Sequence, residues 1–211
     1  MLDFILNIDK SMGEFIALHG IWIYSLLAAV VFGETGLVVL PFLPGDTLLF
    51  AAGSFAALGQ LNAPLLIGLL IIAAVLGNTV NAVFARWIYS KYGDTIFSGR
   101  LSWLDADGLK KTQAFYDKHG GLALVLSRFI PVMRTFAPFV AGLAGMPWAR
   151  FQFYNIAGAV IWVGSLVSAG MLFGNLPWVK QYLNVIILIG VGAAALPVLG
   201  GIIWKLFKKR S

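Results

Sequence analysis

SRFIPVMRTFAP, residues 127–138, places two arginines and two prolines inside a segment that is otherwise apolar. A charge at the centre of a membrane helix costs roughly 2.5 to 3.5 kcal/mol, so Arg128 and Arg134 are expected to face a polar cavity and to have a function. A proline removes a backbone donor and clashes with the preceding helical turn. Pro131 and Pro138 therefore predict a broken helical hairpin in place of one smooth helix, and a break allows both arginines to face one site.

The composition is that of an integral membrane protein. Apolar residues make up 60% of the 211 residues and charged residues only 11%, and the mean hydropathy is +0.88, whereas about 25% of the residues in soluble domains are charged. Several apolar runs reach the roughly 20 residues that a helix needs to cross the hydrocarbon. The predicted fold class is therefore an all-α polytopic membrane protein, with residues 1–211 forming a single membrane domain.

Composition also argues against several functions. The chain has no cysteine and only two histidines, which lie far apart in sequence, so we predict no metal site and no cofactor. The net charge of +6 lies mostly beside apolar spans, where it orients the protein in the membrane, so we predict no nucleic-acid partner. No nucleophile has an adjacent base, so we predict that the protein is not an enzyme. An intramembrane phosphatase would use the same arginines, with His119 as its candidate histidine.

The first half of the chain, residues 15–90, contains a second broken segment. In GETGLVVLPFLPGD, Glu34 and Asp46 flank helix-breaking residues, which predicts a hairpin from about 34 to 59. The residues predicted to interrupt this hairpin are Pro41, Pro44 and Gly45.

The second half, residues 120–174, follows a polar connection. Residues 91–119 form the longest polar stretch and contain a capping-box pattern, which predicts an amphipathic loop outside the bilayer. The broken segment at 120–145 is predicted as the second hairpin, and 182–206 as the last transmembrane helix.

Charge distribution predicts the topology. Lysine and arginine are concentrated in the central loop and in the C-terminal tail, so both are predicted to be cytoplasmic. Two cytoplasmic segments require an even number of crossings between them, which holds if the 120–145 hairpin re-enters the membrane without crossing it. The 34–59 hairpin would then enter from the opposite face. The predicted architecture is an inverted repeat with two facing re-entrant helical hairpins, as in many secondary transporters.

The combined motifs resemble the DedA family, also called the VTT or SNARE-associated superfamily. The resemblance rests on E-x11-D around PFLPGD, on R-x-x-P-x-x-R in SRFIPVMRTFAP, and on the later AG and F-x-x-Y-N-x-x-G, and it covers about residues 15–175. One departure is GNTVNAVFAR, where the family often has G-D-x-x-x-Y-x-x-G-R. Asn78 occupies the aspartate position, so the resemblance carries no role for that acid over to this chain.

The resemblance implies a function and site residues. It implies a multi-pass protein of the bacterial inner membrane that depends on the proton motive force and translocates undecaprenyl phosphate for cell-envelope synthesis. It identifies Glu34 and Asp46 with the family's functional acids, and Arg128 and Arg134 with its functional arginines. Membrane lipids, an anionic lipid phosphate and protons are the expected partners, and the sequence also allows a homo-oligomer.

The chemistry of these residues fits that function. Arginine offers a planar fork that matches phosphate oxygens, so Arg128 and Arg134 are predicted to bind substrate. The pKa of a carboxylate rises on burial and falls beside an arginine, so Glu34 and Asp46 are predicted to couple proton movement to transport.

Each assignment has a structural alternative. The arginines can instead pair with the acids as internal ion pairs, which stabilise a protein only weakly. Asp46 can instead cap the half-helix that begins TLLF. The buried amides are predicted to form hydrogen bonds between helices and to make no ligand contacts; they are Asn78, Asn81 and Asn155. At the level of function, the alternatives are a phospholipid scramblase and a membrane-protein folding or envelope-homeostasis factor.

The topology can be tested by labelling single cysteines introduced into this cysteine-free chain. Cysteine at position 175 is expected to react with a membrane-impermeant thiol reagent from outside. Cysteines at 110 and 208 should react only after the membrane is permeabilised. Labelling of 110 and 208 from opposite sides would mean that the segment 127–138 crosses the bilayer.

Overall fold

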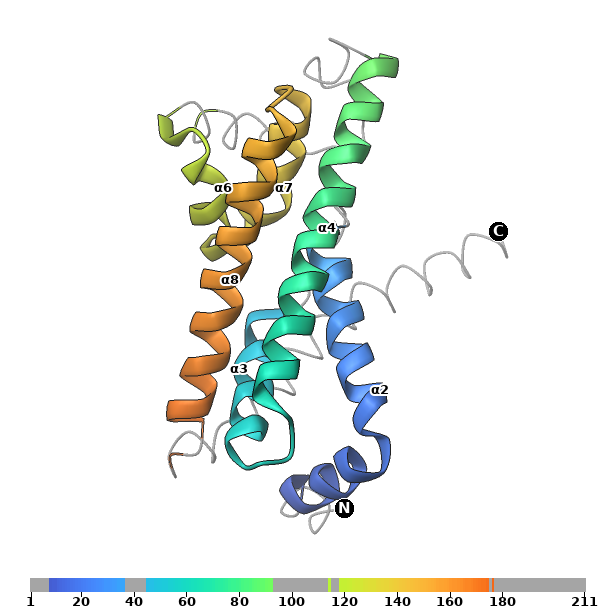
Figure 1. Ribbon diagram of the computed structural model, residues 1–211, viewed down its shortest axis with the longest axis vertical. Helices are drawn as coiled ribbons and strands as arrows, with labels where there is room; N and C mark the ends of the chain where they lie inside the picture. Colours follow the sequence, from blue (N-terminus) through green and yellow to red (C-terminus); the bar gives the residue numbers. More distant parts are fainter. Residues whose placement is uncertain (1–7, 37–44, 93–113, 115–117, 175, 177–211) are drawn as a thin grey trace, which may run out of the picture. The chain divides into compact units, whose positions relative to one another are not determined.

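The computed structural model describes residues 8–36, 45–92, 114, 118–174 and 176, and all regular structure in these ranges is helical (Figure 1). The chain divides into two compact units, which are described separately: unit 1 comprises Met1–Tyr24, Phe42–Leu66 and Leu166–Ser211, and unit 2 comprises Ser25–Pro41 and Ile67–Ser165. The elements are α2 (Ile8–Gly36), α3 (Gly45–Ala57), α4 (Ala63–Tyr92), α6 (Leu122–Leu126), the 3-10 helix η2 (Ser127–Phe129), α7 (Pro131–Leu143) and α8 (Trp148–Phe173).

Two of the described helices, α4 and α8, are long and apolar enough to cross a membrane. Helix α4 has 30 residues and α8 has 26. At a rise of about 1.5 Å per residue, the length of each helix exceeds the thickness of the hydrocarbon layer. Both also expose large apolar side chains, which suits a surface in contact with lipid. On α4 these side chains are Leu65, Ile72, Leu76, Val80, Val83, Phe84, Trp87 and Tyr89.

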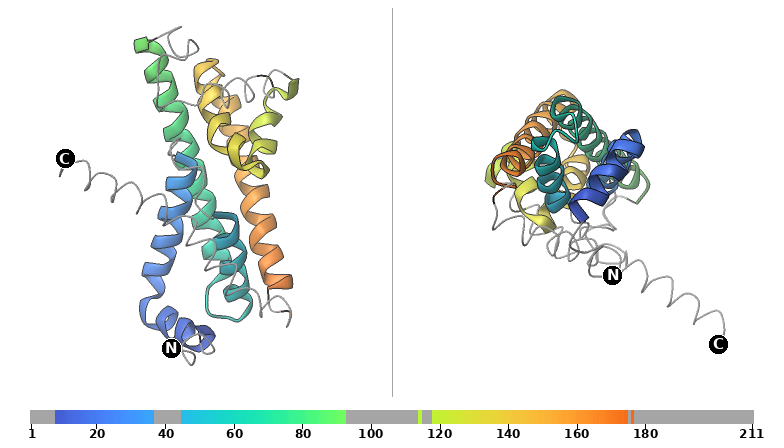
Figure 2. Two further views of the ribbon diagram at one scale, coloured as in Figure 1. Left: turned by 180° about the vertical axis from the view of Figure 1, so that it is seen from behind. Right: turned by 90° about the horizontal axis from the view of Figure 1, so that it is seen from below.

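In unit 2, the helical structure is interrupted within the segment 127–138, as predicted. Helix α6 leads into η2, Ile130 is extended with φ −117° and ψ 108°, and α7 starts at Pro131. The residue before a proline is disfavoured in the helical region, whereas proline suits the first position of a helix. The chain therefore turns at Ile130, and α6, η2 and α7 contact one another (Figure 2).

The prediction that Pro138 also breaks the helix is wrong, because α7 continues through it. A proline has no N–H, so the carbonyl four residues earlier, that of Arg134, loses its usual helical donor, and membrane helices tolerate this where neighbouring helices support the turn. Asn81 on α4 donates its Nδ2–H to the backbone carbonyl of Thr135, over 2.9 Å, in that turn. This bond goes to the residue after Arg134, so it ties α7 to α4 beside the proline without replacing the missing donor.

The end of α7 coincides with the predicted end of the hairpin at Gly145. Gly145 has φ 66°, the left-handed conformation that favours glycine at the C-terminus of a helix. Its N–H bonds to the carbonyl of Gly142, over 3.2 Å, and the N–H of Met146 bonds to the carbonyl of Ala141, over 3.1 Å. These bonds use carbonyls that the helix end would otherwise leave unpaired.

The core of unit 2 lies where α4 packs against the broken helix pair and the start of α8. Small residues on α4 let the aromatic and branched side chains of α7 approach closely, as is usual between membrane helices. Its buried residues are Ala82, Ala85, Ile88, Leu124, Phe136, Ala137, Phe139, Val140, Ala141, Leu143, Met146 and Phe151.

In unit 1, α3 packs directly against the last part of α8. A Cβ added to Gly53 would lie 3.0 Å from the backbone carbon of Val167, and one added to Gly170 would lie 2.9 Å from that of Phe50. The two helices can approach this closely because both positions are glycine. The following helix, α4, is capped by Asn62, the residue before its first one, whose Oδ1 accepts the N–H of Leu65 over 3.0 Å.

The helix bounds differ from the predicted ones mainly in the first half. Helix α2 begins at Ile8, before the predicted first half at 15–90, and it ends at Gly36, so Glu34 lies in its last turn. Gly45 is the first residue of α3. Other predicted features lie outside the described residues: Pro41, Pro44, most of the loop at 91–119 and the last helix at 182–206.

The contact between α3 and α8 predicts that Gly170→Ala lowers the melting temperature of the detergent-solubilised protein by several degrees. The added methyl group would press on backbone atoms, which cannot move aside as a flexible side chain can. Gly164→Ala on the same helix is the matched control, because nothing lies within 4 Å of its added Cβ. Equal melting temperatures for the two variants would contradict this packing.

Candidate functional site

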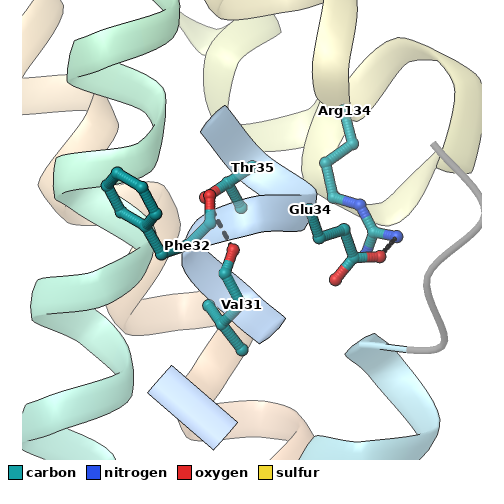
Figure 3. Close-up of polar contacts among 5 residues, drawn as sticks. All are labelled: Val31, Phe32, Glu34, Thr35 and Arg134. Carbon is teal, nitrogen blue, oxygen red and sulfur yellow. Dashed lines mark hydrogen bonds and ion pairs between the residues drawn. The ribbon is translucent and has the colours of Figure 1, made fainter. Parts of the chain in front are cut away.

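A buried ion pair joins α2 to α7 within unit 2. Arg134 donates from Nη2 to Oε1 of Glu34, and Figure 3 shows the two side chains pointing toward each other. The exposed fractions of the side chains are 3% for Arg134 and 0% for Glu34. The sequence separation is 100 residues, so only the tertiary fold brings the two charges together.

Close packing of α2 on α4 holds Glu34 in place. A Cβ on Gly36 would lie 3.3 Å from the Cα of Gly77, so the two backbones nearly touch. Asn81 of α4 donates from Nδ2 to the carbonyl of Thr35, over 3.3 Å, in addition to its bond to α7. The same amide thus bonds to the residue after Glu34 and to the residue after Arg134, which fixes the two backbones that carry the ion pair.

Arg128 is buried in the same unit, but its partner is neutral. Its exposed fraction is 1%, and Nη2 donates to Oδ1 of Asn155 over 2.8 Å and to the backbone carbonyl of Asn155 over 3.2 Å. Among the described residues, no carboxylate forms an ion pair with Arg128, and its Nε and Nη1 atoms have no hydrogen-bond partner. The guanidinium therefore keeps a positive charge that nothing in this part of the chain neutralises.

Trp162 of α8 lies beside both arginines. The guanidinium carbon of Arg128 is 5.8 Å from the ring centroid, and that of Arg134 is 5.3 Å. Trp162 is itself 1% exposed. An indole face attracts cations, so the ring stabilises two guanidinium groups near each other without neutralising either one.

The structure thus brings together three of the four predicted functional residues, Arg128, Arg134 and Glu34, in unit 2. Asp46 belongs to unit 1, where it lies in the first turn of α3. A carboxylate in that turn interacts favourably with the helix dipole, and the capping role of Asp46 stays a prediction. Among the described residues there is no cluster of three or more histidine, cysteine or acidic side chains that could hold a metal ion.

The comparisons with known proteins identify the family. Residues 43–172 match the model of the VTT domain, which covers both arginines and more than half of the chain. The chain is 42% identical to Protein DedA of Escherichia coli (strain K12), over 100% of this chain and 94% of that protein. The chain belongs to the DedA family.

Two further relatives of this DedA-family protein are named inner membrane proteins. This chain is 38% identical to inner membrane protein YqjA of Escherichia coli (strain K12), over 76% of this chain and 71% of that protein. It is 36% identical to inner membrane protein YghB of the same organism, over 76% of this chain and 72% of that protein. No solved structure matches the chain.

Trp162 is not among the predicted site residues, although its position in the sequence is a signal that could have identified it. Tryptophans of membrane proteins usually lie at the membrane interfaces, whereas Trp162 is near the middle of α8. A tryptophan at that depth indicates a polar or charged neighbour. The predicted hydrogen bonds between helices are confirmed, since Asn78 of α4 donates to Asn155 of α8 over 3.0 Å and Asn81 bonds to α2 and α7.

The ion pair gives this DedA-family protein a testable stability pattern. Glu34→Leu should destabilise it by about 3 to 5 kcal/mol, because the Arg134 guanidinium would lose its buried counter-charge. The double variant Glu34→Leu/Arg134→Met should unfold at a higher temperature than Glu34→Leu, since it removes both charges of the pair. Thermal unfolding in detergent measures this, and a double variant less stable than both single variants would contradict the pairing.

Proposed function

We propose that this protein carries an anionic lipid phosphate across the bacterial inner membrane, driven by the proton motive force. The observation that supports this most directly is that the two buried arginines have different partners, one charged and one neutral. Arg134 is paired with Glu34, whereas Arg128 is held by a neutral amide. Undecaprenyl phosphate, recycled for cell-envelope synthesis, is the substrate that the family resemblance favours.

The buried positive charge supports an anionic substrate. Desolvating a cation is costly, and a bound anion offsets that cost. Phosphate oxygens suit the Nε–H and Nη1–H groups of Arg128, because arginine and phosphate form strong charge-assisted hydrogen bonds. A lipid rather than a soluble phosphate fits the apolar outer faces of α4 and α8, along which a hydrocarbon chain can lie in the bilayer.

The ion pair supplies a means of coupling to protons. When ionised, Arg128, Arg134 and Glu34 together carry one net positive charge. A phosphate monoester carries a charge of about −1.5 to −2 near neutral pH. Protonation of Glu34 removes the negative charge and leaves two arginines to neutralise the phosphate. Proton binding and phosphate binding would therefore favour each other, as cotransport requires.

The second broken segment, around Asp46, completes the proposed mechanism. In the predicted inverted repeat, the 34–59 hairpin and the 120–145 hairpin re-enter from opposite faces, and the central loop and the C-terminus are cytoplasmic. Asp46 would then be a second proton-coupling residue on the opposite hairpin. In this proposal the protein is a transporter and not an enzyme. Its partners are membrane lipids and protons, and it binds no nucleic acid.

Reconstituted proteoliposomes test the transport function with a fluorescent undecaprenyl phosphate analogue. The wild-type protein should move the analogue faster when a pH gradient is imposed. Glu34→Gln should still bind it but lose the response to the gradient, because glutamine cannot exchange a proton. Glu14→Gln, at the chain's other glutamate on α2, is the matched control and should respond as the wild type does.

The same assay separates the alternatives. Movement of zwitterionic phospholipid without movement of the phosphate analogue would overturn the proposal in favour of a scramblase. Movement of neither lipid would favour a folding or envelope-homeostasis factor. A Glu34→Gln variant that responds to the gradient like the wild type would remove Glu34 from the coupling step.

A further inference from the structure

The orientation of the Asn155 side chain is fixed by groups other than Arg128. Its Nδ2 donates to the backbone carbonyl of Val75 on α4, over 3.1 Å. A carbonyl oxygen can only accept, so the NH₂ end of the amide must face Val75. The oxygen end then faces the other way, where it accepts from Nδ2 of Asn78 over 3.0 Å and from Nη2 of Arg128 over 2.8 Å.

The next two turns of α8 also contact the Arg128 side chain. Gly158, three residues after Asn155, leaves room for the side chain, since a Cβ there would lie 2.9 Å from Nε of Arg128 and 3.2 Å from its Cδ. Trp162, four residues further on, presents its ring to the guanidinium. Residues at these spacings share one face of a helix. Arg128 thus lies against one face of α8, where the Asn155 amide bonds to it, Gly158 leaves space for it and the Trp162 ring faces its guanidinium.

All of these contacts are neutral, and this distinguishes the two arginines. The carboxylate of Glu34 both orients Arg134 and neutralises it. The amide of Asn155 orients Arg128 and leaves its charge in place. A carboxylate at position 155 has nearly the same shape as the amide and would form a second internal ion pair, with Arg128, while losing the hydrogen bond to the carbonyl of Val75. The neutrality of this side chain therefore decides whether Arg128 is available to an outside anion.

We propose that Asn155 is a positioning residue, which aims Arg128 at the phosphate group of the substrate and, by being neutral, reserves the charge of Arg128 for it. The ligand class is a phosphate monoester on an apolar chain. This inference rests on the proposed lipid-phosphate function and deepens it, because it assigns Arg128 as the phosphate-binding cation while Arg134 is paired with Glu34.

Binding of a short soluble analogue tests the proposal on the full-length protein in detergent. Farnesyl monophosphate is the probe, and isothermal titration calorimetry gives its affinity. Asn155→Asp should weaken binding by about tenfold or more, because the new carboxylate competes with the phosphate for Arg128. Asn155→Ala should weaken binding by a smaller factor, since it loses orientation but adds no competing charge.

Two controls separate positioning from a loss of structure. Farnesol, which has the same chain without phosphate, should bind the wild type and both variants with equal affinity. Asn81→Ala removes another buried asparagine, one with no hydrogen bond to Arg128 among the described residues. Asn81→Ala should lower the melting temperature as Asn155→Ala does. Its affinity for farnesyl monophosphate should nevertheless be higher than that of Asn155→Asp.

The outcomes distinguish this inference from the proposed function. Wild-type affinity for farnesyl monophosphate in Asn155→Asp would overturn the positioning role, even if transport of undecaprenyl phosphate is observed. Equal weakening in Asn155→Asp and Asn81→Ala would also overturn it, since the effect would then follow stability. Selective weakening in Asn155→Asp, together with no transport by the wild type, would support the anion site and reject the transport function.

Discussion

The burial of three charges in unit 2 is the constraint on which the rest of its structure depends. Arg128, Arg134 and Glu34 are each at most 3% exposed, and an unpaired charge in such surroundings costs several kcal/mol. The neighbouring helices therefore supply groups that reduce this cost. Glu34 neutralises Arg134, Asn155 hydrogen-bonds to Arg128, and Trp162 presents its ring to both cations.

The packing of the unit follows from placing these polar groups. Helix α4 contributes small residues, which let α2 and α7 come close, and two asparagines, which bond to other helices at the level of the charges. Asn81 joins the backbones next to Glu34 and Arg134, whereas Asn78 acts on Arg128 through Asn155. The two amides thus support two different arginines, although both lie on one helix within a single turn.

The difference between the partners of the two arginines, a carboxylate for Arg134 and an amide for Arg128, links the structure to the proposed transport cycle. A site with two free arginines would bind phosphate regardless of protons, and a site with two ion pairs would bind none. One paired and one unpaired arginine give a site whose charge changes when a single carboxylate is protonated. In the proposed cycle, this arrangement would couple the two binding events through Glu34, because its partner Arg134 lies beside the same tryptophan ring as Arg128.

The sequence by itself determined the helical class, the break before Pro131 and the three charged residues of the candidate site, because each is visible in the local pattern of residues. An apolar composition predicts membrane helices, and a proline after Ile130 excludes a continuous helix. Only the tertiary structure decided the continuation of α7 through Pro138, the choice of Glu34 as the partner of Arg134, and the place of Trp162 beside both arginines. They depend on donors, charges and rings contributed by distant segments, and no local pattern specifies which distant residue will supply them.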